Sequence, residues 1–208
     1  SLEDFVEKHV RCSGAGATIE NILQQVNSGA TFLAMDLSVA MNGDVTVGSS
    51  EGPLMIEVID KVDGHIEKEG RSSVGFNFEI DTENGKQEGK TVPYYHAYVD
   101  YVMADLWGRY MGERLMITGS DYRSLNHLNE KYPEVDIAFK LYQDDTDIKK
   151  AMARLKFTPK WLSAHSSLIT EDFMKEWHDK GVLIAVWGID SPEEKSRIEA
   201  LEPDAVIY

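Results

Sequence analysis

Residues 161–189 read WLSAHSSLITEDFMKEWHDKGVLIAVWGI, and this stretch decides the fold class. Thr170 is the predicted N-cap of a helix over 171–180, because two acidic residues follow it and acidic side chains stabilise a first helical turn. Gly181 predicts the end of that helix. The run from Val182 to Trp187 is almost continuously apolar, as expected for a strand buried on both faces. The segment therefore predicts two parallel strands joined by a helix.

The same alternation of apolar β-rich runs and segments with helical spacing continues along the chain. We predict strands over 9–12, 31–39, 74–81, 114–120, 135–142, 161–166, 182–189 and 205–208. We predict helices over 19–27, 54–69, 94–110, 122–131, 147–155, 171–180 and 192–201. The last of these helices has Ser191 as its N-cap and Pro192 at its first position.

About eight strands alternating with seven helices predict a small (βα)8 TIM barrel whose final helix is absent or truncated. One domain over 1–208 accounts for the length, and an open, doubly wound sheet is the alternative fold. Residues 42–50 predict a turn and a short strand, and residues 82–91 predict a long exposed loop. In a barrel, ligands bind at the carboxyl ends of the strands, so functional residues are sought there.

Composition excludes several classes of protein. The chain has 36 Asp and Glu against 21 Lys and Arg, a formal net charge of -15, which opposes binding to nucleic acid. No apolar run approaches the ~20 residues that a membrane span needs. Cys12 is the only cysteine and cannot form an internal disulfide. Residues 1–7 show no signal peptide, so we expect a soluble protein whose compartment stays open.

Segments over nearly the whole chain resemble the glycerophosphodiester phosphodiesterase family. The family's His-Arg-Gly and Pro-Glu-Asn-Thr motifs, its Glu-x-Asp motif on the second strand, its Lys-Asp-Gly turn, its His-Asp pair and its Glu-Ile-Lys strand all have counterparts. These are Arg11-Cys12-Ser13, Ile19-Glu20-Asn21-Ile22, Ala34-Met35-Asp36, Met41-Asn42-Gly43, Ser49-Ser50 and Glu79-Ile80-Asp81. Residues 181–189 and 202–207 are similar to the family's last two strands.

The resemblance implies a barrel of lipid metabolism that cleaves glycerophosphodiesters. In the family, two histidines act as general acid and base, an arginine holds the phosphate, and two glutamates and an aspartate bind a divalent metal. Most of this set is replaced here, by Arg11 and Ser49 at the histidines, Cys12 at the arginine, Ala34 at one glutamate and Asp81 at a lysine. Only Asp36 and Glu79 are retained.

Loss of both histidines predicts loss of catalysis, because a positioned acid or base is typically worth 10²–10⁴-fold in rate. The sequence therefore favours an inactive member of the family that serves as a binding or regulatory module for a phosphate-bearing small molecule. The alternative is an active, metal-dependent phosphoric diester hydrolase with non-standard catalytic groups. A third interpretation is a scaffold that dimerises through a tyrosine-rich helix over 94–110.

Three carboxylates, of Asp36, Glu79 and Asp81, are the candidate ligands of one divalent cation, Mg²⁺ or Ca²⁺. Glu79 and Asp81 are two positions apart on one strand, so both side chains point to the same side. Arg11 is a candidate phosphate ligand, and the alternative is a buried ion pair that neutralises Asp36 and Glu79.

Replacement catalytic groups would come from Lys140 and His165, which end predicted strands, or from Cys12 if Arg11 lowers its pKa. For His165 the alternative is a structural histidine, and for Cys12 it is an inert small residue. Lys140 is also a candidate ligand-binding residue. Trp187 either lines the substrate pocket or closes the barrel core.

Overall fold

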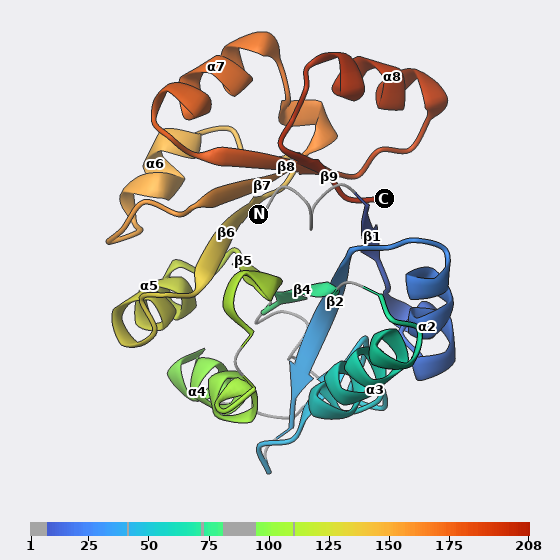
Figure 1. Cartoon of the computed structure of the whole chain (residues 1–208). Helices are drawn as coiled ribbons and strands as arrows, with labels where there is room; N and C mark the ends of the chain where they lie inside the picture. Colours follow the sequence, from blue (N-terminus) through green and yellow to red (C-terminus); the bar gives the residue numbers. More distant parts are fainter. Residues whose placement is uncertain (1–7, 41, 72, 81–94, 110) are drawn as a thin grey trace.

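The computed structural model describes residues 8–40, 42–71, 73–80, 95–109 and 111–208. Eight parallel strands form a ring, and the helices lie outside it (Figure 1). The predicted (βα)8 barrel is therefore confirmed. Each strand follows the predicted position to within two residues: β1 His9–Arg11, β2 Phe32–Val39, β4 Gly75–Glu79, β5 Leu115–Gly119, β6 Asp136–Leu141, β7 Trp161–His165, β8 Leu183–Trp187 and β9 Ala205–Val206.

The ring closes between its first and last strands. The sheet runs in the order β1-β2-β4-β5-β6-β7-β8-β9, and His9 also forms a parallel bridge with Ile207. The Arg11 amide donates to the Tyr208 carbonyl at 2.8 Å, and the Tyr208 amide donates to the His9 carbonyl at 3.1 Å. The predicted short strand is β3 (Val45–Val47), which pairs antiparallel with β2 outside the ring.

Seven α-helices connect the strands within the described residues: α2 Ile19–Asn27, α3 Met55–Lys68, α4 Tyr95–Leu106, α5 Tyr122–Lys131, α6 Ile148–Ala153, α7 Glu171–Asp179 and α8 Pro192–Ala200. Three short 3₁₀ helices lie over Gly14–Gly16, Gly112–Arg114 and Ser166–Leu168. The loop predicted over 82–91 lies outside the described residues.

The helix starts are fixed by the capping residues seen in the sequence. Thr170 Oγ1 accepts from the Phe173 amide at 3.1 Å, and Ser191 Oγ accepts from the Glu194 amide at 3.1 Å. Each hydroxyl satisfies a backbone donor that has no partner inside the helix. These caps start α7 and α8 at the predicted residues.

Alternation along the strands divides the buried residues into two cores. One lies between the ring and its helices and is the larger. The other fills the barrel, where Phe32 packs so closely on Gly75 that a Cβ there would lie 2.2 Å from the ring. The members of the inner core are Phe32, Ala34, Met116, Ala138, Trp161, Ala185, Ala205 and Ile207. Above it, the same inward positions carry the polar residues of the mouth.

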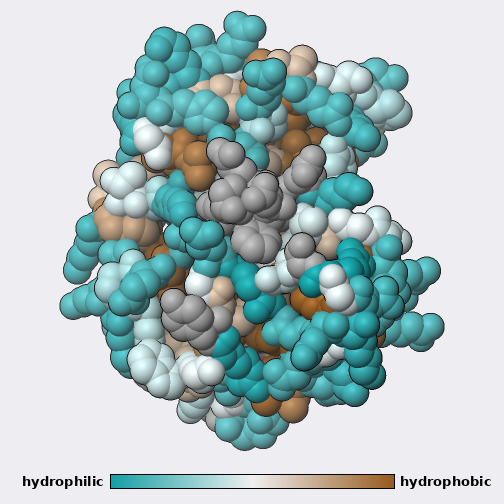
Figure 2. Space-filling view, in the orientation of Figure 1, coloured by the Kyte–Doolittle hydropathy of each residue, from teal (hydrophilic) through white to brown (hydrophobic). Residues whose placement is uncertain are grey.

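The face seen in Figure 2 is covered mostly by hydrophilic side chains, in keeping with the high content of charged residues. Hydrophobic residues show between them in small areas (Figure 2). Within the part of the chain that the structure describes, no helix combines the length and apolarity needed to cross a membrane.

Candidate functional site at the barrel mouth

Four charged side chains meet at the carboxyl ends of the strands. Asp36 on β2 and Glu79 on β4 are direct register partners, so their carboxylates lie side by side. Arg11 reaches both carboxylates from β1, and Lys140 reaches Glu79 from β6. The sequence placed all four at the mouth, and the structure joins them in one ion-pair network.

Arg11 binds both carboxylates at once. Its two terminal nitrogens donate to Glu79 Oε2 at 2.9 and 2.7 Å, and one of them also donates to Asp36 Oδ1 at 3.0 Å. A guanidinium presents its donors in a fixed plane, so it can bridge two neighbouring carboxylates in this way. The structure thus shows the ion pair that the sequence offered as the alternative to a phosphate contact at Arg11.

Lys140 occupies the other oxygen of the same carboxylate. Its ammonium is hydrogen-bonded to Glu79 Oε1, and its side chain is only 8% exposed. The ammonium also lies 4.6 Å from the ring centre of Trp187 and 5.0 Å from that of Tyr142. Aromatic faces attract cations, so the two rings and the carboxylate hold Lys140 from several sides. Sequence reasoning missed Tyr142, although it follows Lys140 by two positions and so shares its side of the strand.

The network has no net charge, because two carboxylates face two cations. Burial raises the pKa of the Glu79 carboxyl above its ordinary value, while the charges of Lys140 and Arg11 oppose the rise. A buried carboxylate costs several kcal/mol of desolvation unless it is paired and hydrogen-bonded. Arg11 and Lys140 supply that pairing, so the burial of an ionised Glu79 carboxylate depends on both cations.

The metal that the resemblance implies does not fit these carboxylates as they stand. Both oxygens of Glu79 and one of Asp36 accept hydrogen bonds from cationic side chains, so a divalent ion would meet two positive charges at its ligands. Among the described residues, no three His, Cys, Asp or Glu side chains are grouped in a way that could hold a metal. Asp81 lies outside those residues, so its role as a ligand stays a prediction.

His165 ends β7 beside the network, with its ring edge-on to Trp187 at 4.9 Å. Its Nδ1 accepts from the Ser167 amide at 3.2 Å and lies 2.8 Å from the Ser167 hydroxyl. This nitrogen therefore caps the 3₁₀ helix that follows. Gly188, at a φ of 79°, lies against the ring, and a Cβ there would lie 2.6 Å from Nε2. These contacts match the structural-histidine alternative.

Cys12 does not point into the mouth. It follows Arg11 on β1 and so lies on the other side of the sheet, in the core beneath the helices. Burial raises the pKa of the Cys12 thiol to about 11. The expectation that Arg11 activates this thiol therefore has no support in the geometry, which matches the inert alternative.

His9 lies one layer below Arg11, inside the barrel, and is completely buried. Its Nε2 is 3.3 Å from Asn77 Nδ2, and Asn77 Oδ1 accepts from Thr118 Oγ1 at 2.6 Å. Burial, with help from the charge of Arg11, lowers the pKa of His9 to about 3. This histidine is a neutral, packed part of the barrel interior.

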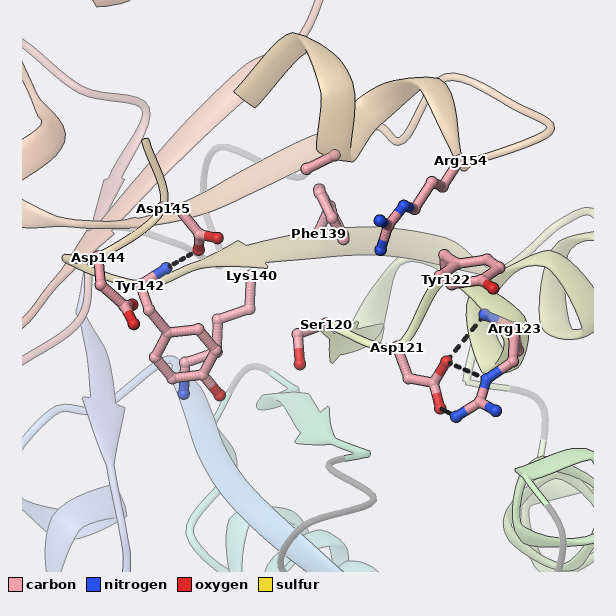
Figure 3. A pocket seen from close by; sticks show the side chains of 11 residues that line it. Ser120, Asp121, Tyr122, Arg123, Phe139, Lys140, Tyr142, Asp144, Asp145 and Arg154 are labelled. Carbon is pink, nitrogen blue, oxygen red and sulfur yellow. Dashed lines mark hydrogen bonds and ion pairs between the residues drawn. The ribbon is translucent and has the colours of Figure 1, made fainter. Parts of the chain in front are cut away.

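A cavity of about 550 Å³ opens beside the network, over the ends of β5 and β6 and between α5 and α6 (Figure 3). Lys140 and Tyr142 lie at its inner end, together with Asp144 and Asp145. Arg154 lies at its outer end, over the Tyr122 ring at 5.6 Å from the centroid. No carboxylate among the described residues pairs with this guanidinium. Arg154 follows a short helix and belongs to no recognisable motif, so sequence reasoning missed it.

Trp187 lies between the inner core and the mouth, and its role in lining a substrate pocket stays a prediction. Its ring packs against the inner core and also contacts Tyr142 and His165 at the mouth, while its Nε1 donates to the Ser163 carbonyl at 3.1 Å. In the tyrosine-rich helix α4, Tyr98 is buried, and its hydroxyl donates to the Leu37 carbonyl. Dimerisation through that helix stays a prediction.

Solved structures share this barrel at low sequence identity. A Silicibacter pomeroyi DSS-3 protein assigned as a glycerophosphoryl diester phosphodiesterase is 14% identical, with a TM-score of 0.76 over 97% of this chain and 90% of that chain. An Oleispira antarctica phosphodiesterase, in complex with the product sn-glycerol-3-phosphate, is 11% identical, with a TM-score of 0.74 over 99% and 94%. A Thermotoga maritima glycerophosphodiester phosphodiesterase is 19% identical, with a TM-score of 0.65 over 97% and 93%. These likenesses establish the fold.

Sequence comparison establishes the family. No curated protein matches the chain. The sequence model of the glycerophosphoryl diester phosphodiesterase family, in contrast, matches residues 18–208, which extend from the cap of α2 through the last strand. The chain therefore belongs to the glycerophosphoryl diester phosphodiesterase family.

Proposed function

We propose that this barrel is a catalytically inactive member of its family that binds a phosphate-bearing small molecule. The observation that carries the proposal is the hold of Arg11 and Lys140 on Glu79. A guanidinium engaged with two carboxylates stands where the family has a histidine, and it does not exchange a proton near neutral pH.

The other groups at the mouth do not restore proton transfer. Ser49 stands at the second histidine position, and its hydroxyl accepts from the Glu51 amide at 3.3 Å within a local turn. Lys140 is paired to Glu79, and the Nδ1 of His165 is held by Ser167. Losing an acid and a base would remove roughly 6–11 kcal/mol of transition-state stabilisation if the two effects added.

The cavity beside the network supports the binding part of the proposal. A volume of about 550 Å³ lies within the usual range for small-molecule sites. Arg154 lies at one end, and its guanidinium pairs with no carboxylate among the described residues. A guanidinium can bind two phosphate oxygens at once. Asp144 and Asp145 line the other end, where they repel an anion and can accept hydrogen bonds from hydroxyls. A ligand whose phosphate binds Arg154 and whose hydroxyl groups lie near Asp144 and Asp145 fits both ends of the cavity.

Glycerol 3-phosphate is the appropriate first probe, because it carries both chemical groups and is the product bound to the Oleispira antarctica relative. We expect calorimetric titration to give saturable binding that Arg154→Gln weakens about tenfold or more. Lys150→Gln is the matched control, since it removes the same charge from α6, the helix that Arg154 follows, at an exposed residue outside the cavity lining. Equal losses in both variants, or no binding to the wild type, would reject the phosphate site.

A further inference from the structure

The charges of the four side chains at the mouth oppose binding of a divalent metal ion. Asp36 and Glu79 together carry two negative charges, the charge that one divalent ion neutralises. Here Arg11 supplies a positive charge to both carboxylates, and Lys140 supplies a second one to the other oxygen of Glu79. The network is therefore electrically complete, and a divalent ion added to it would leave two excess positive charges at a site where Glu79 is only 5% exposed.

Both cationic side chains are also fixed by several contacts, which oppose their displacement by a metal ion from solution. Lys140 is buried and lies over the faces of Trp187 and Tyr142. Arg11 makes three hydrogen bonds to the two carboxylates. Displacing either side chain would take a cation away from the buried carboxylate of Glu79, and the cost of that displacement opposes metal binding.

We infer that Arg11 and Lys140 act as built-in counter-ions that take the place of a divalent metal, and that Asp36 and Glu79 form a latent metal site which opens when both cations are removed. Two carboxylates on neighbouring strands, with waters completing the shell, suffice for a weak Mg²⁺ or Mn²⁺ site. This inference concerns the metal alone and holds whether or not a phosphate ligand binds.

The test measures Mn²⁺ binding through the electron paramagnetic resonance signal of the free ion. The Glu79→Gln substitution should therefore leave Mn²⁺ binding by the wild-type chain unchanged. The double variant Arg11→Gln/Lys140→Met should gain about one Mn²⁺ per chain, and adding Glu79→Gln to it should weaken that binding about tenfold or more.

A matched control removes the same two residue types from exposed ion pairs. Arg109→Gln/Lys175→Met frees Asp60 and Asp179 at the surface, and it changes the net charge equally. It should gain no comparable site, which separates a built site from the general attraction of an acidic protein for cations.

Circular dichroism shows whether each variant folds. The single variants Arg11→Gln and Lys140→Met each remove one cation and so disturb the fold less than the double variant. If the double variant folds only in Mn²⁺, and the version that also carries Glu79→Gln does not, the latent site is supported. Glu79-dependent Mn²⁺ binding by the wild type would overturn the inference. So would the absence of any Glu79-dependent gain in the double and single variants.

Discussion

Glu79 Oε2 lies 2.9 and 2.7 Å from the two terminal nitrogens of Arg11, a residue 68 positions earlier in the chain. The two residues are brought together by the closed ring of strands, in which β1 and β4 both flank β2. At the residue where the family resemblance predicts a histidine, the chain has an arginine that is held by two carboxylates. The stability, pH dependence and chemistry expected of the mouth follow from this pairing and from Lys140 beside it.

Removing Lys140 should destabilise the fold strongly, because Glu79 would lose one of its two cations while it stays buried. Breaking a buried pair from one side costs about 3–5 kcal/mol, so Lys140→Met should lower the free energy of unfolding in urea by about that amount. The double variant Lys140→Met/Glu79→Gln should recover part of the loss. Lys175→Met, in the exposed pair with Asp179, is the control and should change stability by about 1 kcal/mol or less. Equal effects of the two lysine variants would contradict the account.

His9 should make the protein less stable in mild acid. Its folded pKa is lowered to about 3 from an ordinary value of 6.5, so below pH 6.5 the unfolded chain binds a proton that the folded chain does not. The contribution of neutral His9 to the free energy of unfolding is complete above pH 6.5. It is lost as the pH falls toward 3, by about 1.4 kcal/mol per pH unit at the steepest. Urea unfolding between about pH 5 and 6.5 should show a weaker pH dependence in His9→Gln than in the wild type. Identical pH dependence in both proteins would argue against a neutral, buried His9.

Gly188 should be the more sensitive of two glycines that have similar backbone angles. Gly181 and Gly188 have φ values of 76° and 79°, but only at Gly188 would a Cβ meet a side chain, the His165 ring at 2.4 Å. Both alanine variants carry the backbone strain of about 1 kcal/mol, and Gly188→Ala should lose about 1–3 kcal/mol more. Trp187, which touches His165, should report the shift as a fluorescence change in Gly188→Ala alone. A loss at Gly181→Ala as large as that at Gly188→Ala would show that packing on His165 matters little.

Cys12 should be nearly inert toward thiol reagents in the folded chain. With a pKa raised to about 11, about one thiol in a thousand is ionised at pH 8, and the side chain is buried as well. Labelling with a disulfide reagent should be slow in buffer and fast in urea, with a native rate set by opening of the fold. Rapid labelling of the native protein would place Cys12 at the surface instead.

Most of the architecture could be predicted from the sequence, because it rests on local signals. The buried run from Val182 to Trp187, the caps at Thr170 and Ser191, and the stop at Gly181 each specify an element without reference to distant residues. The family resemblance then placed the strand ends at the mouth, and Arg11, Asp36, Glu79 and Lys140 do meet there.

What could not be predicted depends on which way each side chain points and on which partner it finds. Cys12 was expected at the mouth with Arg11, but neighbours on a strand face opposite sides, and only the start of β1 decides which one enters the barrel. The pairing of Lys140 with Glu79 joins two strands that are not adjacent in the ring. Arg154 reaches its cavity from the end of a short helix that no motif marks.

A ³¹P nuclear magnetic resonance assay of the purified chain with glycerophosphodiesters and Mg²⁺, Ca²⁺ or Mn²⁺ tests directly whether the barrel is catalytically inactive. Glu79→Gln serves as the blank, because it removes the carboxylate on which any metal-dependent mechanism at this mouth would rely. Glycerol 3-phosphate should form no faster with the wild type than with Glu79→Gln. Accumulation of glycerol 3-phosphate with the wild type and not with the variant would contradict it and establish an active hydrolase.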